Sequence, residues 1–125
     1  MQPLILIGYW RGENDTSWPE PAAFVDRDWD KTERGLVASY LSAATVVVTY
    51  MGYSHCRLCS KKDNGDSELT DGVYIWPDGL KHYVTEHNVR LPRRFVEHVL
   101  DRLAKFDLGP LNYDTGWWQK VKLGD

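Results

Sequence analysis

The clearest pattern of apolar and polar positions lies near the C-terminal end of the chain. Between Pro92 and Gly109-Pro110, apolar residues recur at the 3.6-residue period of an amphipathic helix. Proline suits the first helical position and a Gly-Pro pair ends a helix, so we expect a helix over 92–106. His98 lies off the apolar stripe and is expected to face solvent. The tail after Leu111 is expected to lie on the core as a strand or an extended segment. The apolar positions are Phe95, Val96, Val99, Leu100, Leu103 and Phe106.

Two shorter helices are predicted upstream. One follows Asp28 or Asp30, either of which can cap it, and runs to about position 42. The other spans 77–87, where a proline at the first position and an aspartate in the first turn both favour a helix start. Asn88 can end that helix because asparagine tolerates the left-handed conformation.

Three strands are expected between these helices and before them. Leu4–Gly8 is a short apolar run, and 44–53 is rich in β-branched and aromatic residues and is expected to be well buried at its start. A third strand, 73–76, follows the turn signal Asp71-Gly72, whereas 60–67 is expected to be a polar turn. The pattern predicts an α+β fold, with a short sheet and about three helices in one small domain, 1–125.

Length and composition agree with a single globular domain. The chain has 125 residues, 42% of them hydrophobic and 26% charged, with a formal net charge of −3. A small negative net charge does not indicate tight binding to nucleic acid or to a membrane, both of which carry negative charge. No apolar run approaches the roughly 20 residues of a membrane span. The two cysteines are three positions apart and cannot staple distant segments, so we expect a reducing, cytoplasmic compartment.

Four candidate metal ligands fall within a short part of the chain, in the order C-x2-C-x22-H-x4-H. They are Cys56, Cys59, His82 and His87. Two thiolates and two imidazoles favour one zinc ion in a closed, tetrahedral, structural site. The order of knuckle, hairpin and helix predicts a treble-clef-like zinc core over about 52–92.

Two alternatives remain open for these residues. The cysteines could instead form a redox pair, although they precede a polar turn and do not start a helix. His55 could replace one of the histidine ligands. Five helical steps of 100° place His82 and His87 about 140° apart, so the last turn of the helix must be tightened or frayed if both bind one ion.

The segment 52–91 resembles small bacterial proteins of uncharacterised function. They share C-x-x-C, then WP-x-G-L-x-H-Y-V, then H-x-V-x-L-P, which stand here at 56–59, 76–84 and 87–92. The resemblance covers about a third of the chain. It implies a metal-binding core and brings no known activity with it.

The functional expectation is a non-enzymatic, zinc-stabilised domain that binds a protein partner. A closed site leaves no coordination position for a substrate, and tryptophans outside the helical stripes could anchor an interface. One alternative is nucleic-acid binding through basic residues around the zinc unit, which neighbouring acids nearly cancel in number. A second alternative is a zinc-dependent hydrolase with Glu86 as base, although H-E-x-x-H is missing. The tryptophans in question are Trp10, Trp18, Trp117 and Trp118.

Overall fold

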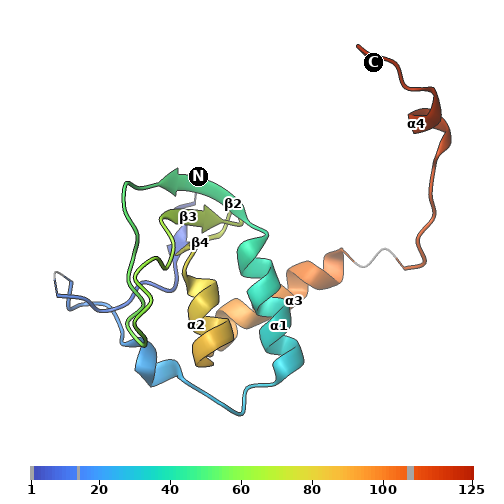
Figure 1. Cartoon of the computed structure of the whole chain (residues 1–125). Helices are drawn as coiled ribbons and strands as arrows, with labels where there is room; N and C mark the ends of the chain where they lie inside the picture. The colour runs from blue at the N-terminus through green and yellow to red at the C-terminus, as the bar shows by residue number, and fades with distance from the viewer. Residues whose placement is uncertain (1, 14, 107–108) are drawn as a thin grey trace.

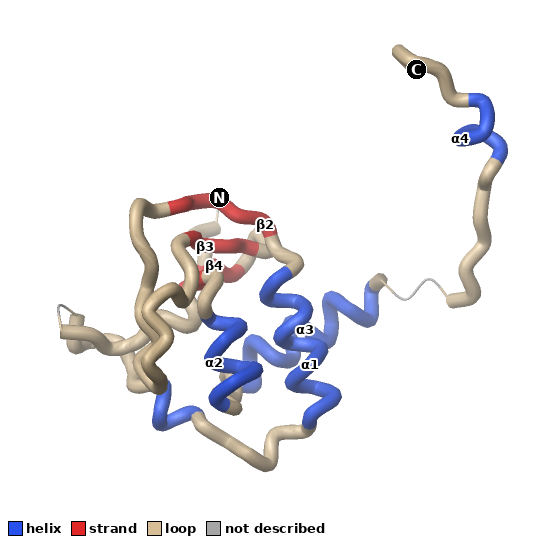
Figure 2. The backbone as a smooth tube through the Cα atoms, viewed as in Figure 1, coloured by secondary structure: helices blue, strands red, loops and turns tan. Residues whose placement is uncertain are grey.

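Four strands form one mixed sheet in the computed structural model, which describes residues 2–13, 15–106 and 109–125 (Figures 1 and 2). The sheet order is β1-β4-β3-β2, in which β1 and β4 are parallel and the other neighbours are antiparallel. The strands are β1 (Ile5–Leu6), β2 (Thr45–Thr49), β3 (Ser67–Thr70) and β4 (Tyr74–Pro77).

Three helices pack together beside this sheet (Figure 1). They form a helical layer beside a mixed sheet, so the α+β class predicted from the sequence is confirmed. In the part of the chain that the structure describes, no helix is long and apolar enough to cross a bilayer. The helices are α1 (Lys31–Ser42), α2 (Leu80–His87) and α3 (Arg93–Lys105), and the remaining helical segments are a 3-10 turn, η1 (Pro21–Phe24), and α4 (Gly116–Lys120).

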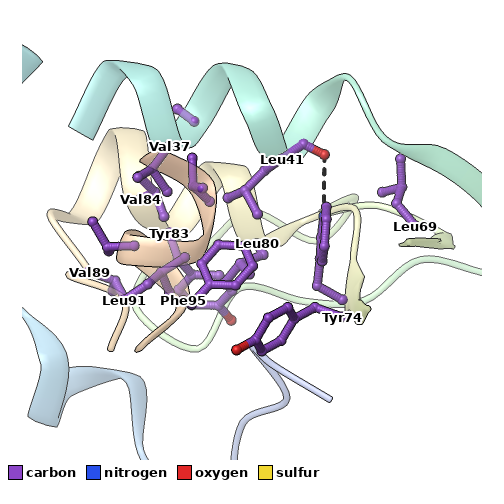
Figure 3. Close-up of a cluster of buried hydrophobic side chains, with 14 of the residues drawn as sticks. Val37, Leu41, Leu69, Tyr74, Leu80, Tyr83, Val84, Val89, Leu91 and Phe95 are labelled. Atoms are coloured by element: carbon purple, nitrogen blue, oxygen red, sulfur yellow. Dashed lines mark hydrogen bonds between the residues drawn. The ribbon is translucent and has the colours of Figure 1, made fainter. Parts of the chain in front are cut away.

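The hydrophobic core lies between β3–β4 and the three helices (Figure 3). Trp76 is fully buried, and its indole N–H donates to the carbonyl of Leu41 at 3.2 Å. Phe95 of α3 packs edge-on against Tyr74 and Trp76, with ring centroids 5.0 and 5.7 Å away. Burying a large apolar side chain stabilises a fold by about 1.5–3 kcal/mol, so this aromatic cluster is a main source of stability.

The predicted helix ends are confirmed at three places. Asp30, one of the two candidate caps, accepts a hydrogen bond from the backbone N–H of Glu33 at 2.9 Å. Asn88 follows α2 in the left-handed conformation, with φ 53° and ψ 32°. Pro92 precedes α3, as its fixed φ favours at the start of a helix.

Strand β2 differs from its prediction in length and in burial. It covers Thr45–Thr49 only, and all five residues are exposed, whereas the sequence predicted a longer strand buried at its start. Val46 is 54% exposed and Val47 48%. The strand is exposed because β2 is the last strand in the sheet order. Its β-branched residues predicted a strand correctly but not its burial, since such residues favour strands whether or not they are buried.

Strand β3 was not predicted, because Ser67–Thr70 holds a single apolar residue, Leu69. Leu69 is buried and pairs with Val46 on one side and Trp76 on the other. Hydrogen bonding to β2 on one edge and to β4 on the other stabilises this polar strand. The sequence of β3 itself carries no pattern that reveals these partner strands.

His98 is not solvated, contrary to prediction. Its Nε2 atom lies 2.7 Å from Oδ2 of Asp71, and the two side chains are 19% and 7% exposed. The Tyr40 hydroxyl donates to the same carboxylate oxygen. Asp71 therefore joins α1, the β3–β4 turn and α3.

The C-terminal tail does not lie on the core, so that prediction is wrong. Residues 109–125 extend away from the sheet and helices (Figure 1). They form the short helix α4, whose Trp117 and Trp118 are 65% and 70% exposed.

Candidate metal centre

A pair of chain segments carries the two cysteines away from the sheet. Segment 50–56 continues from β2, and segment 61–66 leads back into β3. Backbone hydrogen bonds join the segments, from the Tyr50 N–H to the Asp66 carbonyl at 2.8 Å and from the Ser54 N–H to the Gly65 carbonyl at 2.9 Å. We call these paired segments the arm.

The tip of the arm is a tight loop, 56–61, that we call the knuckle. Its ends are closed by a hydrogen bond from the Cys56 N–H to the Lys61 carbonyl at 2.9 Å. The Leu58 N–H donates to Sγ of Cys56 at 3.4 Å. An N–H directed at a cysteine sulfur stabilises the thiolate form that a metal requires.

The knuckle and α2 bring all four predicted ligands together. Sγ of Cys56 lies 3.5 Å from Nε2 of His87, and Sγ of Cys59 lies 3.3 Å from Nε2 of His82. All four ligand atoms lie within 4.8 Å of one another. A tetrahedral zinc ion, with bonds of about 2.3 Å to sulfur and about 2.0 Å to nitrogen, would place such ligands about 3.5 Å apart. The four side chains therefore lie close enough to hold a metal ion and fit a zinc core.

The end of α2 explains how both histidines reach one point. The backbone N–H of Asn88 donates to the carbonyl of Tyr83, five residues earlier, instead of to the carbonyl four residues earlier. A wide turn of this kind brings positions five apart closer to one face. Of the two distortions expected from the sequence, the tightened turn is wrong, and the observed end is widened.

Burial favours the uncharged form of two of the ligands. It raises the pKa of the Cys56 thiol, and the nearby Cys59 adds to that rise while the Leu58 N–H opposes it. Burial also lowers the pKa of the His82 imidazole, and the neighbouring His87 lowers it further. Neutral imidazole is the form that binds metal, whereas the thiols must release protons when an ion binds.

Tyr83 connects the metal ligands to the N-terminal part of the chain. Its hydroxyl accepts a hydrogen bond from the Arg57 N–H at 2.8 Å, and burial raises the pKa of this tyrosine to about 12. Its ring lies 5.7 Å from that of Trp10, which packs against Phe24 at the same distance. Sequence spacing does not predict this role of Tyr83, although the residue stands between the two histidine ligands on α2.

The other histidines lie apart from the four ligands. His55 is exposed and does not belong to the cluster, so it is not needed as a substitute ligand. His98 belongs to the separate network around Asp71. Comparison with protein-family models, with curated proteins and with solved structures finds no match for this chain.

Proposed function

We propose that this chain is a non-enzymatic, zinc-stabilised domain that binds a protein partner in a reducing, cytoplasmic compartment. The observation that carries the proposal is the convergence of two thiols and two imidazoles from the knuckle and α2. Two soft sulfur donors and two imidazoles favour zinc over magnesium or calcium, which prefer oxygen ligands.

A structural role for zinc follows from the number of protein ligands. Each imidazole lies within 3.5 Å of one thiol, so all four positions of a tetrahedral ion are supplied by side chains. A hydrolase would need one histidine to withdraw so that water could bind, with Glu86 as the base. Both histidines have packed neighbours, since the rings of His82 and His87 lie 4.9 Å apart and each contacts Tyr83.

The edge of the sheet offers a surface for a protein partner. Val46, Val47 and Val48 of β2 are 37–54% exposed, and Tyr50 and Met51 beyond them are also exposed. Segment 45–53 carries no charged residue. An uncharged, exposed edge strand is a template to which another chain can add a strand through backbone hydrogen bonds.

The nucleic-acid alternative has weaker support. Three of the seven basic residues around the metal centre form ion pairs with neighbouring acids, which reduces the positive charge available to phosphates. Their partners are Asp26, Asp63 and Glu97. The seven are Arg57, Lys61, Lys62, Lys81, Arg90, Arg93 and Arg94.

The metal part of the proposal is tested by elemental analysis of protein purified without chelator, beside thermal melts with and without EDTA. We expect one zinc per chain and a large fall in the melting temperature with EDTA, because the energy of metal binding is also folding energy here. Zinc-free protein that melts at the same temperature with and without EDTA would overturn the structural site.

The partner is tested by crosslinking in cells from a photoreactive residue placed at Val47. A control chain carries the same group at Leu123, which is fully exposed in the tail. We expect a protein adduct that depends on the β2 position and disappears when Val46 and Val48 are replaced by lysine. Identical adducts from both positions would contradict docking on β2.

A further inference from the structure

A pocket opens between the N-terminal loop and the arm. Its volume is about 450 Å³, and it is lined by residues from 8–13 and 15–18, which we call the N-terminal loop, and by parts of the arm, β3 and the start of α2. This volume falls in the range of pockets that hold a small ligand or a large side chain. The metal ligands do not line it, although Arg57 of the knuckle and Tyr83 of α2 do.

Aromatic rings form much of the wall of the pocket. Tyr9 and Trp18 of the loop have ring centroids 6.1 Å apart, and Tyr50 and Tyr53 of the arm complete the lining together with Trp10. Aromatic faces carry partial negative charge and attract cations placed within about 6 Å.

Four carboxylates line the same pocket, at Glu13, Asp15, Asp66 and Glu68. Within the described ranges, none of these four forms an ion pair, although several other acids of the domain do. The one Lys or Arg in the lining is Arg57, whose guanidinium donates instead to the carbonyls of His55 and Arg11. The pocket therefore combines aromatic walls with an excess of negative charge.

Glu68 stands where these two features meet. Its Oε1 atom accepts a hydrogen bond from the Tyr50 hydroxyl at 3.2 Å. Burial raises the pKa of Tyr9, and the neighbouring Glu68 carboxylate raises it further. In strand β3 the adjacent Leu69 faces the core, so alternation places Glu68 on the opposite face of the sheet.

One buried polar group of the lining residues lacks a hydrogen-bond partner. Among residues 2–13, 15–106 and 109–125, the Trp10 indole N–H has none. A buried polar group without a hydrogen-bond partner destabilises the folded protein.

We infer that this pocket binds the guanidinium group of an arginine side chain presented by a partner polypeptide. A planar guanidinium stacks on aromatic rings and pairs with a carboxylate through two N–H groups. The inference rests on the proposed protein-binding function and names the chemistry of the partner. Arg57 and Tyr83 line the pocket and also lie beside the metal ligands. Loss of the metal is therefore expected to open the pocket.

The test is a titration of the zinc-loaded, ¹⁵N-labelled full chain with N-acetyl-arginine amide, followed through the indole N–H signals of its six tryptophans. We expect the signals of Trp10 and Trp18 to shift, whereas those of Trp117 and Trp118 stay in place. N-acetyl-citrulline amide has the same shape without the charge and is expected to leave all six unchanged. Equal shifts with citrulline, or with tetramethylammonium, would overturn the assignment to a guanidinium.

Two variants assign the site to the pocket. Glu68→Gln removes the charge and keeps the shape, and it should weaken arginine binding roughly tenfold. Glu97→Gln removes an exposed acid on α3 and should leave binding unchanged, with equal zinc content and melting temperature as the folding control. Undiminished binding by Glu68→Gln would refute the inference. This titration needs no partner, so its outcome is independent of the crosslinking experiment. Arginine binding without a crosslink from β2 would refute only the proposed function. A crosslink from β2 without arginine binding would refute only the inference about the pocket.

Discussion

Sγ of Cys59 lies 3.3 Å from Nε2 of His82, although 23 positions separate the two residues. Cys59 belongs to the knuckle, at the tip of an arm that leaves the sheet, whereas His82 belongs to the first turn of α2, which packs in the core. Apart from the metal ligands, few large apolar side chains hold the knuckle, since Leu58 is only partly buried. An ion bound here would therefore fix the arm against the core.

The first prediction concerns the metal ligands. Cys59→Ser and His82→Ala should each lose zinc and lower the melting temperature by more than about 10 °C, because several kcal/mol of metal-binding energy stabilise the fold. His55→Ala is the matched control, since this histidine is a close neighbour outside the cluster. Zinc content and thermal melts should be measured on the same samples.

Two outcomes would contradict that prediction. A variant that loses its zinc and keeps the melting temperature would show that the metal does not hold the fold. Full zinc content in His82→Ala, lost only when His55 is also replaced, would show that His55 can take the place of His82 as a ligand.

The sequence predicted those features that depend on local spacing. The helix caps at Asp30 and Asn88 can be recognised from a few neighbouring residues, and the structure agrees with both. The order C-x2-C-x22-H-x4-H can be recognised because only a few side-chain types bind zinc, and the structure brings these four residues together. Features made by distant partners were missed. Strand β3 depends on pairing with two neighbours, and half-buried His98 contacts Asp71, 27 positions away.

Burial on the sheet was misjudged for a similar reason. The run at Val46–Val48 predicts a strand but cannot tell an edge from a centre, and only the strand order places it at the edge. The pocket likewise joins residues of 8–13 and 15–18 to residues between 50 and 83, and no sequence periodicity relates these segments.

The second prediction concerns the contact between the arm and the start of α2. A Cβ atom on Gly79 would lie 2.3 Å from the backbone oxygen of Asn64, whose buried side chain donates to the Gly79 carbonyl at 3.3 Å. Gly79→Ala must push the arm away from α2 and should cost about 1–3 kcal/mol. Urea denaturation measures the change.

Gly35 provides a control of opposite sign. It lies inside α1, and a Cβ atom there would meet nothing within 4 Å. Gly35→Ala should therefore stabilise the protein by about 0.5–1 kcal/mol through the helix propensity of alanine. Equal effects of the two substitutions would mean that the arm does not pack on α2 as described.

The third prediction concerns acid and the Asp71 network. Burial alone would raise the pKa of Asp71, but hydrogen bonds from the Tyr40 hydroxyl, from the N–H groups of Tyr74 and Val73, and from His98 outweigh it and lower that pKa to about 2. A carboxyl whose pKa is lowered by folding contributes stability above its unfolded pKa of about 3.9. That contribution is lost as the pH falls through about 2.

Asp71→Asn tests this network, because asparagine keeps the turn before Gly72 and removes the charge. At pH 7 it should cost roughly 2 kcal/mol, as expected for hydrogen bonds to a charged group. Acid also releases metal from thiolates and imidazoles in both proteins, so the useful quantity is the difference in unfolding free energy between variant and parent. That difference should shrink between pH 4 and pH 2. The control is Asp101→Asn, which removes an exposed ion pair with Lys105 and should change the free energy of unfolding by less than about 0.5 kcal/mol at any pH. A difference that is constant with pH would mean that the Asp71 carboxylate is not stabilised by Tyr40 and His98.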